Sequence, residues 1–380
     1  MAQTKPTQTQ YEPWLAPTAK PFVRIDNVTK VFGNTYAVDG VSLDIYKGEF
    51  FCLLGGSGCG KSTLLRMLAG LEQPTSGRIL IDGVDMTHTP PYERPVNMMF
   101  QSYALFPHMS VEQNVAFGLH QERLGRGEIR DRVAELLELV QMSAYARRKP
   151  DQLSGGQRQR VALVRSLAKH PKLLLLDEPL AALDKKLRAR TQFELMNIQE
   201  KVDTTFIMVN HDQEEAMTVS SRMAVMDTGT IVQVGTPLGV YEYPVNRYVA
   251  EFIGAVNILE GRVVERRDDG LLIHSPSTGI DMLMEHGQLL PEGTLVNVAL
   301  RPEKLLVSEQ PPADGLNYVL GIVNEYAYLG DVSIYHIRLA SGQELRVQLT
   351  NQMRLTENPL TWDQEVYLTW HPGSGVVLPA

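Results

Sequence analysis

Short, continuous runs of apolar residues mark the first two thirds of the chain, at residues 51–54, 173–176 and 206–209. Runs of this length without alternation are typical of strands that are buried on both faces. Longer segments with a helical period separate them. In one of these, residues 128–142, five apolar side chains fall on a single stripe, namely Ile129, Val133, Leu136, Leu137 and Val140. The alternation of such strands and helices predicts an α/β domain with a parallel sheet core.

The pattern changes after Gly254. Helical periods disappear there, and short β-like runs follow one another with Gly and Pro between them, at residues 271–273, 295–300, 318–323, 334–339 and 344–349. This spacing predicts a small all-β barrel. Residues 1–20 are rich in Gln, Thr and Pro, so we expect a flexible N-terminal arm over 1–20, the α/β domain over 21–252 and the β domain over 253–380.

Composition and charge exclude several classes of protein. Thirty-six Lys plus Arg against 44 Asp plus Glu give 36 − 44 = −8, which argues against a nucleic-acid partner held by a basic surface. With 43% hydrophobic and 21% charged residues, the chain is not expected to be disordered. No apolar run approaches the roughly 18 residues of a membrane span, and the first 20 residues lack the apolar core of a signal peptide, so we expect a soluble protein of the cytoplasm. Cys52 and Cys59 have the spacing of neither a disulfide framework nor a zinc site.

The strongest chemical signal is a phosphate-binding loop between an apolar strand and a helical run. The loop consists of Gly55, Gly56, Ser57, Gly58, Cys59, Gly60, Lys61, Ser62 and Thr63. Its glycines let successive backbone N–H groups converge on phosphate oxygens, and the new helix adds its positive N-terminal end. We expect Lys61 to reach the β- and γ-phosphates and the Ser62 hydroxyl to ligate Mg²⁺. The alternative, a glycine-rich turn, does not account for the strand and helix on either side.

Two adjacent carboxylates, Asp177 and Glu178, follow the apolar run 173–176. At the tip of a buried strand they are costly unless they bind a cation or take up a proton. Because side chains alternate along a strand, the two cannot both point the same way. We therefore expect Asp177 to hold Mg²⁺ and Glu178 to act on the attacking water as general base. A solvated strand end is the alternative.

A second anion cradle is predicted at Ser154, Gly155, Gly156 and Gln157, which precede a helical segment. Ser154 has the character of an N-cap, and the glycines expose the first N–H groups of the helix. An ordinary helix start is the alternative. Because one nucleotide does not need two cradles from the same chain, we expect this one to contact the γ-phosphate of a nucleotide bound to a second copy, in a head-to-tail pair with two-fold symmetry.

Together with Gln101, Asp184 and His211, these motifs resemble the nucleotide-binding subunit of an ABC transporter over residues 22–250. The resemblance implies that Gln101 senses Mg²⁺ and the water while its loop forms a permease docking groove. It implies that Asp184 lies at the dimer interface and that His211 bonds the γ-phosphate and positions Glu178. Phe32 would stack on adenine. The alternatives are a solvated loop for Gln101, a helix start for Asp184, a strand end for His211 and a core position for Phe32.

The chain departs from the family pattern at three positions. Asn210 stands where Thr or Ser is common, Ala181 where Gly or a small polar residue is common, and Gly56 where Pro is frequent. None of these changes removes a catalytic group.

Within ABC proteins, a separate subunit with a C-terminal β extension resembles the ATPases of binding-protein-dependent importers. Residues 299–303 and 328–331 resemble their OB-like, transport-associated regulatory domain. Residues 94–109 and 252–257 are most similar to the putrescine/spermidine branch, with iron and sugar importers as alternatives. The resemblance implies an ATP-hydrolysing enzyme that uses ATP and Mg²⁺, forms a homodimer on two integral-membrane permease subunits, and works indirectly with a periplasmic solute-binding protein. It would lie peripherally on the cytoplasmic face of the inner membrane.

Three other functions are considered. A soluble ABC ATPase acting on ribosomes or DNA ends usually carries tandem cassettes or a long coiled coil, and this sequence has neither a second phosphate loop nor heptads. A generic P-loop kinase or GTPase leaves residues 154–157 unexplained. A sensor function for residues 254–380 is compatible with transport.

Overall fold

The computed structural model describes residues 12–16, 18–122, 124–181, 183–285, 290–312, 315–351 and 360–380. The chain divides into two compact units, one ending at Leu238 and the other running over Gly239–Ala380. Of the predicted N-terminal arm, residues 1–11 and 17 lie outside the described part. Pro13–Leu15 forms a short 3₁₀ turn, and the Trp14 ring centroid lies 5.1 Å from the guanidinium carbon of Arg222.

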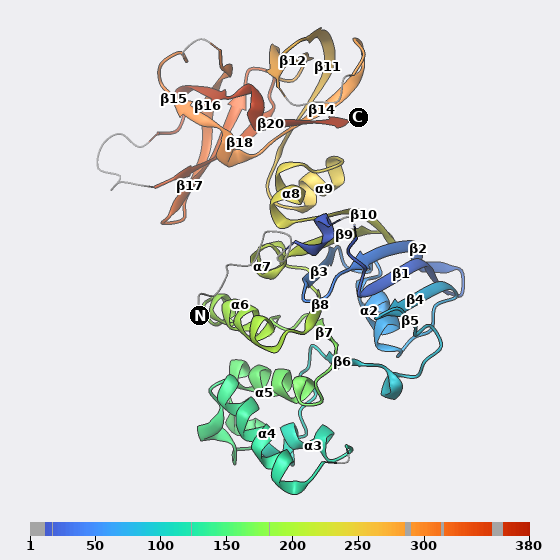
Figure 1. Ribbon diagram of the computed structural model, residues 1–380. Coiled ribbons are helices and arrows are strands. Elements are labelled where there is room, and N and C mark those ends of the chain that lie inside the picture. The colour runs from blue at the N-terminus through green and yellow to red at the C-terminus, as the bar shows by residue number, and fades with distance from the viewer. Residues whose placement is uncertain are drawn as a thin grey trace, which may run out of the picture. The chain divides into compact units, whose positions relative to one another are not determined.

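A six-stranded sheet forms the centre of the first unit (Figure 1). Its strands, in spatial order, are β10 (Thr230–Gly235), β9 (Arg222–Asp227), β3 (Phe50–Gly55), β8 (Thr205–Val209), β7 (Leu173–Asp177) and β6 (Val96–Met99). Neighbouring strands are parallel except for β10, which pairs antiparallel with β9. Every residue of β3 and β8 is buried, as the continuous apolar runs predict. The predicted parallel core is confirmed.

A second sheet in this unit is antiparallel and was not predicted from the sequence. Its strands, in spatial order, are β2 (Thr35–Ile45), β1 (Val23–Phe32), β4 (Ser76–Ile81) and β5 (Val84–Asp85). Burial alternates at the start of β1, where Val23 and Ile25 are buried and Arg24 is exposed. One face of the sheet therefore packs into the core, next to the helix that follows the phosphate loop.

The helices of the first unit fall into two groups. One group is α3 (Val111–Leu119), α4 (Arg126–Leu139) and α5 (Gly155–Leu167), which pack on one another (Figure 1). The others are α2 (Lys61–Ala69), α6 (Lys185–Val202) and α7 (Gln213–Val219). The predicted stripe is buried, with four of its side chains in α4 and Val140 directly after it. None of the helices in the described part of the chain has the length and apolar character needed to cross a membrane.

The second unit is built mainly of strands. Its first sheet has the order β13 (Ile280–Met284), β12 (Gly270–Ser275), β11 (Asn257–Arg267), β14 (Leu295–Leu300) and β20 (Gly375–Pro379). Its second has the order β15 (Leu306–Ser308), β19 (Glu365–Trp370), β16 (Asn317–Tyr328), β17 (Val332–Leu339) and β18 (Glu344–Thr350). All pairings are antiparallel, and the two sheets contribute side chains to one core. The predicted all-β class is confirmed.

Two short helices join the units along the chain, α8 (Pro237–Glu242) and α9 (Arg247–Phe252). Ala250 of α9 packs with Ala299 and Leu378 of the β structure. By its contacts α9 thus belongs to the second unit, which begins at Gly239, and not to the α/β domain predicted over 21–252.

Candidate functional site

The phosphate loop lies between the end of β3 at Gly55 and the start of α2 at Lys61. Gly60 is the N-cap residue of α2, with φ +102°, and as a glycine it leaves the first N–H groups of the helix without a side-chain cap. A Cβ atom at Gly60 would collide with the carbonyl oxygen of Ala37, so only glycine fits this close approach. Gly56 and Gly58 are exposed, with open space beside them. The loop therefore presents the first N–H groups of α2 to the outside, as an anion site requires.

The Lys61 side chain lies inside this loop. Its ammonium donates to the carbonyl oxygens of Gly55 at 2.7 Å and Gly56 at 2.8 Å, and it lies 3.5 Å from the Cys59 sulfur. Lys61 is only 6% exposed. A buried ammonium is costly without such partners, so the loop holds one positive charge where phosphate oxygens would be received.

Asp177 ends β7 and is partly buried. Burial, and next the charge of neighbouring Glu178, raise the pKa of the Asp177 carboxyl above its ordinary value, while the charge of Arg66, the nearby Ser62 hydroxyl and the charge of Lys61 act in the opposite direction. Asp177 and Ser62 thus place two oxygen ligands beside each other at the start of α2.

This donor set fits the Mg²⁺ that the resemblance implies. Ser62 and Asp177 supply a hydroxyl and a carboxylate oxygen, the ligand type that Mg²⁺ prefers, and the resemblance adds the amide oxygen of Gln101. Across the residues that the structure describes, no three His, Cys, Asp or Glu side chains gather into a metal site. A cation at this point would therefore depend on phosphate oxygens as well, which is the usual way that Mg²⁺ is bound beside a nucleotide.

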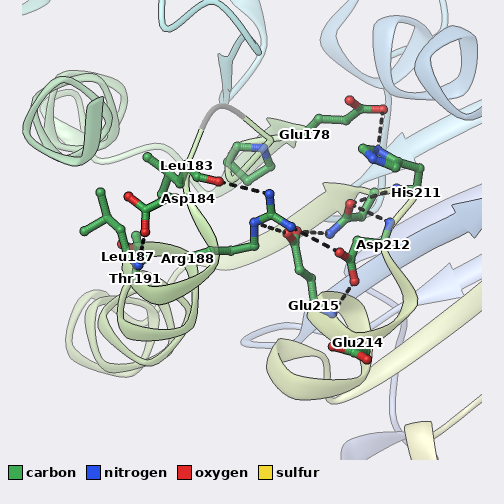
Figure 2. A network of polar contacts seen from close by, with 12 residues as sticks. Glu178, Leu183, Asp184, Leu187, Arg188, Thr191, His211, Asp212, Glu214 and Glu215 are labelled. Carbon is green, nitrogen blue, oxygen red and sulfur yellow. Dashed lines mark hydrogen bonds and ion pairs between the residues drawn. The ribbon is translucent and has the colours of Figure 1, made fainter. Parts of the chain in front are cut away.

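Glu178 directly follows the last residue of β7 and leaves the strand conformation. It has a left-handed backbone with φ +45°, and its N–H donates to the carbonyl oxygen of Val209 at 3.1 Å. Its Oε2 accepts a hydrogen bond from Gln101 Nε2 at 3.0 Å. Its Oε1 lies 3.3 Å from His211 Nδ1 (Figure 2). These three residues follow β7, β6 and β8, which are neighbouring parallel strands, so the sheet brings their carboxyl ends together.

The Gln101 loop is held by the side chains of Arg165 and Tyr103, neither of which has a role predicted from the sequence. Tyr103 and Ala104 both have left-handed backbones, with φ +61° and +46°, and Arg165 of α5 donates to their carbonyl oxygens at 2.9 and 2.8 Å. The Tyr103 hydroxyl donates to the carbonyl oxygen of Pro179 at 3.3 Å. These contacts tie the loop both to α5 and to the turn that carries Glu178. Because the partners are far apart in the sequence, no local signal indicates them.

Ser154 begins α5 with a complete capping box. Its hydroxyl accepts from the Gln157 N–H at 3.3 Å, and the Gln157 side chain accepts from the Ser154 N–H at 2.9 Å. Gly155 is partly exposed, so its N–H group is one that an anion could meet. Gly156 is buried against Leu187, so the expectation that both glycines are exposed is wrong for it. Within the described residues, no hydrogen bond or ion pair links residues 154–157 to the phosphate loop, Glu178 or His211.

Asp184 caps α6, where its Oδ1 accepts from the Leu187 N–H at 3.0 Å. The alternative of a helix start is therefore observed. Asp184 is exposed, and its contact with a second copy stays a prediction. Phe32 lies at the end of β1 and is 49% exposed, with the Lys30 ammonium 4.8 Å from its ring centroid. The ring is a surface feature and not part of the core.

Comparisons with known proteins agree with this architecture. A family model described as ABC transporter matches residues 38–181, and a TOBE domain model matches residues 298–378. The chain is 58% identical to the putrescine transport ATP-binding protein PotG of Escherichia coli strain K12, over 94% of this chain and 95% of the relative. It is 45% identical to the spermidine/putrescine import ATP-binding protein PotA of Thermotoga maritima, over 94% and 97%.

Among solved structures, the ATP-binding cassette MJ0796, in a dimeric post-hydrolysis state bound to ADP and Pi, is 32% identical. It covers 57% of this chain and 98% of its own, with a TM-score of 0.51. The protein cbiO1 from Clostridium perfringens, part of the ABC transporter complex cbiONQ, is 31% identical over 58% of this chain and 90% of its own, with a TM-score of 0.55.

Proposed function

The chain belongs to the family of ABC transporter ATP-binding proteins, and from this membership we propose that it hydrolyses ATP to energise the import of a polyamine, putrescine or spermidine, through a membrane permease. The observation that carries the solute class is the 58% identity to a putrescine transport subunit over nearly the full length of both chains. Its C-terminal β unit falls within this match. The solute itself would not touch this chain, so the proposal rests on relatedness and not on a binding pocket.

Hydrolysis is assigned to the residues at the carboxyl ends of the parallel strands. Glu178 accepts a proton from the attacking water, since its carboxylate is held by Gln101 at 3.0 Å and His211 at 3.3 Å. Lys61 exchanges its carbonyl partners for phosphate oxygens and neutralises their charge. Ser62, Asp177 and Gln101 would hold Mg²⁺, which neutralises charge on the phosphates when bound.

We assign the second cradle to another copy of the chain. Ser154 and Asp184 are both exposed, so a partner copy can reach them. No catalytic carboxylate or lysine is in hydrogen-bond contact with Ser154 or Gln157. The dimeric state of the related cassette MJ0796 with ADP and Pi supports this assignment. ATP would then favour the closed head-to-tail pair, and hydrolysis, which separates charged products, would favour opening.

We assign permease docking to a groove in the α3–α4 region. This hollow of about 760 Å³ is lined largely by apolar side chains, among them Met109, Phe117, Ile129 and Val133. Residues 108 and 109 of its lining continue directly from the Gln101 loop, and Arg165 ties that loop to α5. Movement of the loop would thus reach a permease helix seated here. Two permease subunits and a periplasmic solute-binding protein complete the importer, which places this subunit on the cytoplasmic face of the inner membrane.

The experiment is purification of the tagged chain from detergent-solubilised membranes, followed by reconstitution with the permease subunits and solute-binding protein that accompany it. We expect ATP hydrolysis in these proteoliposomes to rise with putrescine or spermidine. Stimulation by a sugar or by ferric iron, and not by polyamines, would overturn the solute class. Recovery of ribosomes or DNA in place of membrane proteins would overturn transport.

Docking has its own matched pair of variants. Phe117 is 41% exposed in the groove, and Phe193 is 60% exposed on α6. We expect Phe117→Asp to lose the permease subunits during purification and Phe193→Asp to retain them. Equal retention by both variants would place the docking site elsewhere.

A further inference from the structure

The loop after β8 is held by the side chain of Asn210, the residue at which the chain departs from the family pattern. Asn210 is 2% exposed. Its Oδ1 accepts hydrogen bonds from the N–H groups of His211 at 2.7 Å and Asp212 at 3.0 Å. Its Nδ2 donates to Oε2 of Glu215 at 2.5 Å. The backbone of His211 is therefore fixed by one buried amide group, which is fixed in turn by a buried carboxylate.

Glu215 connects this loop to α6. It is 3% exposed and belongs to α7, whose N-cap Asp212 accepts from the Glu215 N–H at 3.1 Å. The second carboxylate oxygen of Glu215 forms an ion pair with Arg188 Nε at 3.0 Å. Burial is the main cause that raises the pKa of Glu215, with the charge of Asp212 adding to it, while Asn210, Arg188 and His211 act in the opposite direction. The carboxylate thus depends on its two partners.

Arg188 extends the network to the turn before α6. Its Nη1 donates to Asp212 at 3.3 Å, and its Nη2 donates to the carbonyl oxygen of Leu183 at 3.0 Å (Figure 2). Leu183 directly precedes Asp184, which is expected to meet the partner copy. An unbroken series of polar contacts therefore runs from the Leu183 carbonyl through Arg188, Glu215 and Asn210 to the backbone of His211, whose ring contacts Glu178.

We propose that Arg188, Glu215 and Asn210 form a positioning relay. The relay holds the His211 imidazole against Glu178 and links its position to that of the 183–184 turn. The inference rests on the proposed ATPase function and assigns three further residues to it. A buried ion pair often contributes little net stability, since apolar residues of similar volume can replace it, so stability alone does not explain this network. The relay gives the turn at the expected dimer interface a direct path to the hydrolytic residues.

The test compares Arg188→Met with Arg190→Met, which removes an exposed charge from the same helix. Arg190 pairs only with Glu194 among the described ion pairs, and its side chain is 68% exposed. Steady-state kcat, KM for ATP and the melting temperature are measured for both. A misplacement of about 1 Å can cost about 10²-fold in rate, so we expect Arg188→Met to lower kcat about 10- to 100-fold with little change in KM. Arg190→Met should match the unmodified protein in all three.

Asn210 supplies a conservative series. Asn210→Asp keeps an oxygen for the backbone N–H groups but replaces the donor that faces Glu215, so we expect a fall in kcat similar to that of Arg188→Met. Asn210→Thr keeps a hydroxyl that can donate and accept, and we expect it to retain most of the activity. The double variant Arg188→Met with Asn210→Asp should lose little more than either single one, because the residues act as a unit.

Two results would overturn the relay. The first is a kcat for Arg188→Met and Asn210→Asp equal to that of Arg190→Met. The second is a variant whose melting temperature is lower but whose kcat and KM are unchanged at temperatures well below its melting temperature. That result would make the network purely structural. Glu178→Gln, measured in the same preparations, separates this failure from failure of the ATPase assignment, since only the latter leaves Glu178→Gln fully active.

Discussion

Two helices of the first unit begin at glycine-rich turns that suit an anion, and their surroundings differ. At the start of α2, Gly60 caps the helix without a side-chain bond, a buried lysine lies in the loop, and Asp177 approaches Ser62. At the start of α5, Ser154 and Gln157 satisfy each other's backbone groups. Both starts offer N–H groups, but only the first lies at the strand ends that carry the carboxylates. The comparison teaches that a helix start becomes a candidate catalytic site through the sheet beside it. A role for the second start toward a partner copy stays a prediction.

The largest effect is expected from Glu178→Gln, which tests whether the first region holds the hydrolytic base. The amide is isosteric and cannot accept the proton, and a positioned base supplies about 10²- to 10⁴-fold, so we expect phosphate release at saturating ATP to fall by that factor. Binding of a fluorescent ATP analogue should be unchanged, which controls for folding of the loop. Full steady-state activity would show that Glu178 is not the base.

A smaller effect is expected from Phe32→Ala, which asks whether the first region extends to an adenine platform. Stacking of a base on an aromatic ring contributes about 1 to 3 kcal/mol, so we expect ATP to bind about 5- to 150-fold more weakly. Tyr92→Ala is the control, because Tyr92 is also an exposed ring of this unit, at 83%. An equal affinity in both variants would remove Phe32 from the site.

Mixing two inactive subunits tests the difference between the two helix starts directly. Lys61→Ala disables the first start and Ser154→Arg the second. Mixed dimers then contain one site with both defects and one intact site. Random pairing makes half of the dimers mixed, so we expect about a quarter of the unmodified activity if each site works independently. ATPase activity that stays at the level of either variant alone would count against sharing between copies.

The phosphate loop and the parallel sheet were largely predictable because their sequence signals are local. The phosphate loop is a contiguous motif, and the buried strands are contiguous apolar runs, so each carries its meaning within a few residues. The antiparallel sheet of β1, β2 and β4 was not predicted, since polar residues interrupt its apolar alternation. The roles of Ser154 and Asp184 toward a partner stay predictions, because one chain cannot display them.

The residues that hold the site together could not be predicted. Arg165 reaches carbonyl oxygens 61 and 62 positions away, and Arg188 reaches Asp212 across 24 positions. Such pairs are set by which strands neighbour each other, and a surface arginine on a helix has the same local pattern whether or not it has a buried partner. Asn210 was identified only as a departure from the family pattern, and its hydrogen bonds give that departure a physical meaning.

The smallest effect is on stability. It distinguishes Asp177, the carboxylate beside the start of α2, from Asp85, a carboxylate that serves the fold. The pKa of Asp177 is raised above 3.8, chiefly by burial, so its ionised form is less favourable in the folded than in the unfolded chain. This cost is absent below pH 3.8 and appears as the pH rises through the raised value. Without nucleotide or Mg²⁺ at pH 7, Asp177→Asn should therefore raise the melting temperature of the first unit.

Asp85→Asn provides the opposite sign. The pKa of Asp85 is lowered, first by the Thr87 hydroxyl, which donates to it at 2.5 Å, and next by the Thr87 N–H at 2.9 Å. Its ionised form is favoured by folding, a contribution that is present at pH 7 and lost as the pH falls through the lowered value. Asp85→Asn should accordingly lower the melting temperature at pH 7. Asp85 has no assigned role in the nucleotide site, so Asp85→Asn should keep the ATPase activity. Asp177→Asn, in contrast, should gain stability and lose Mg²⁺-dependent hydrolysis. A loss of stability in Asp177→Asn would mean that neighbouring groups stabilise the ionised carboxylate in the folded chain. Asp177 would then serve the fold and not a cation site.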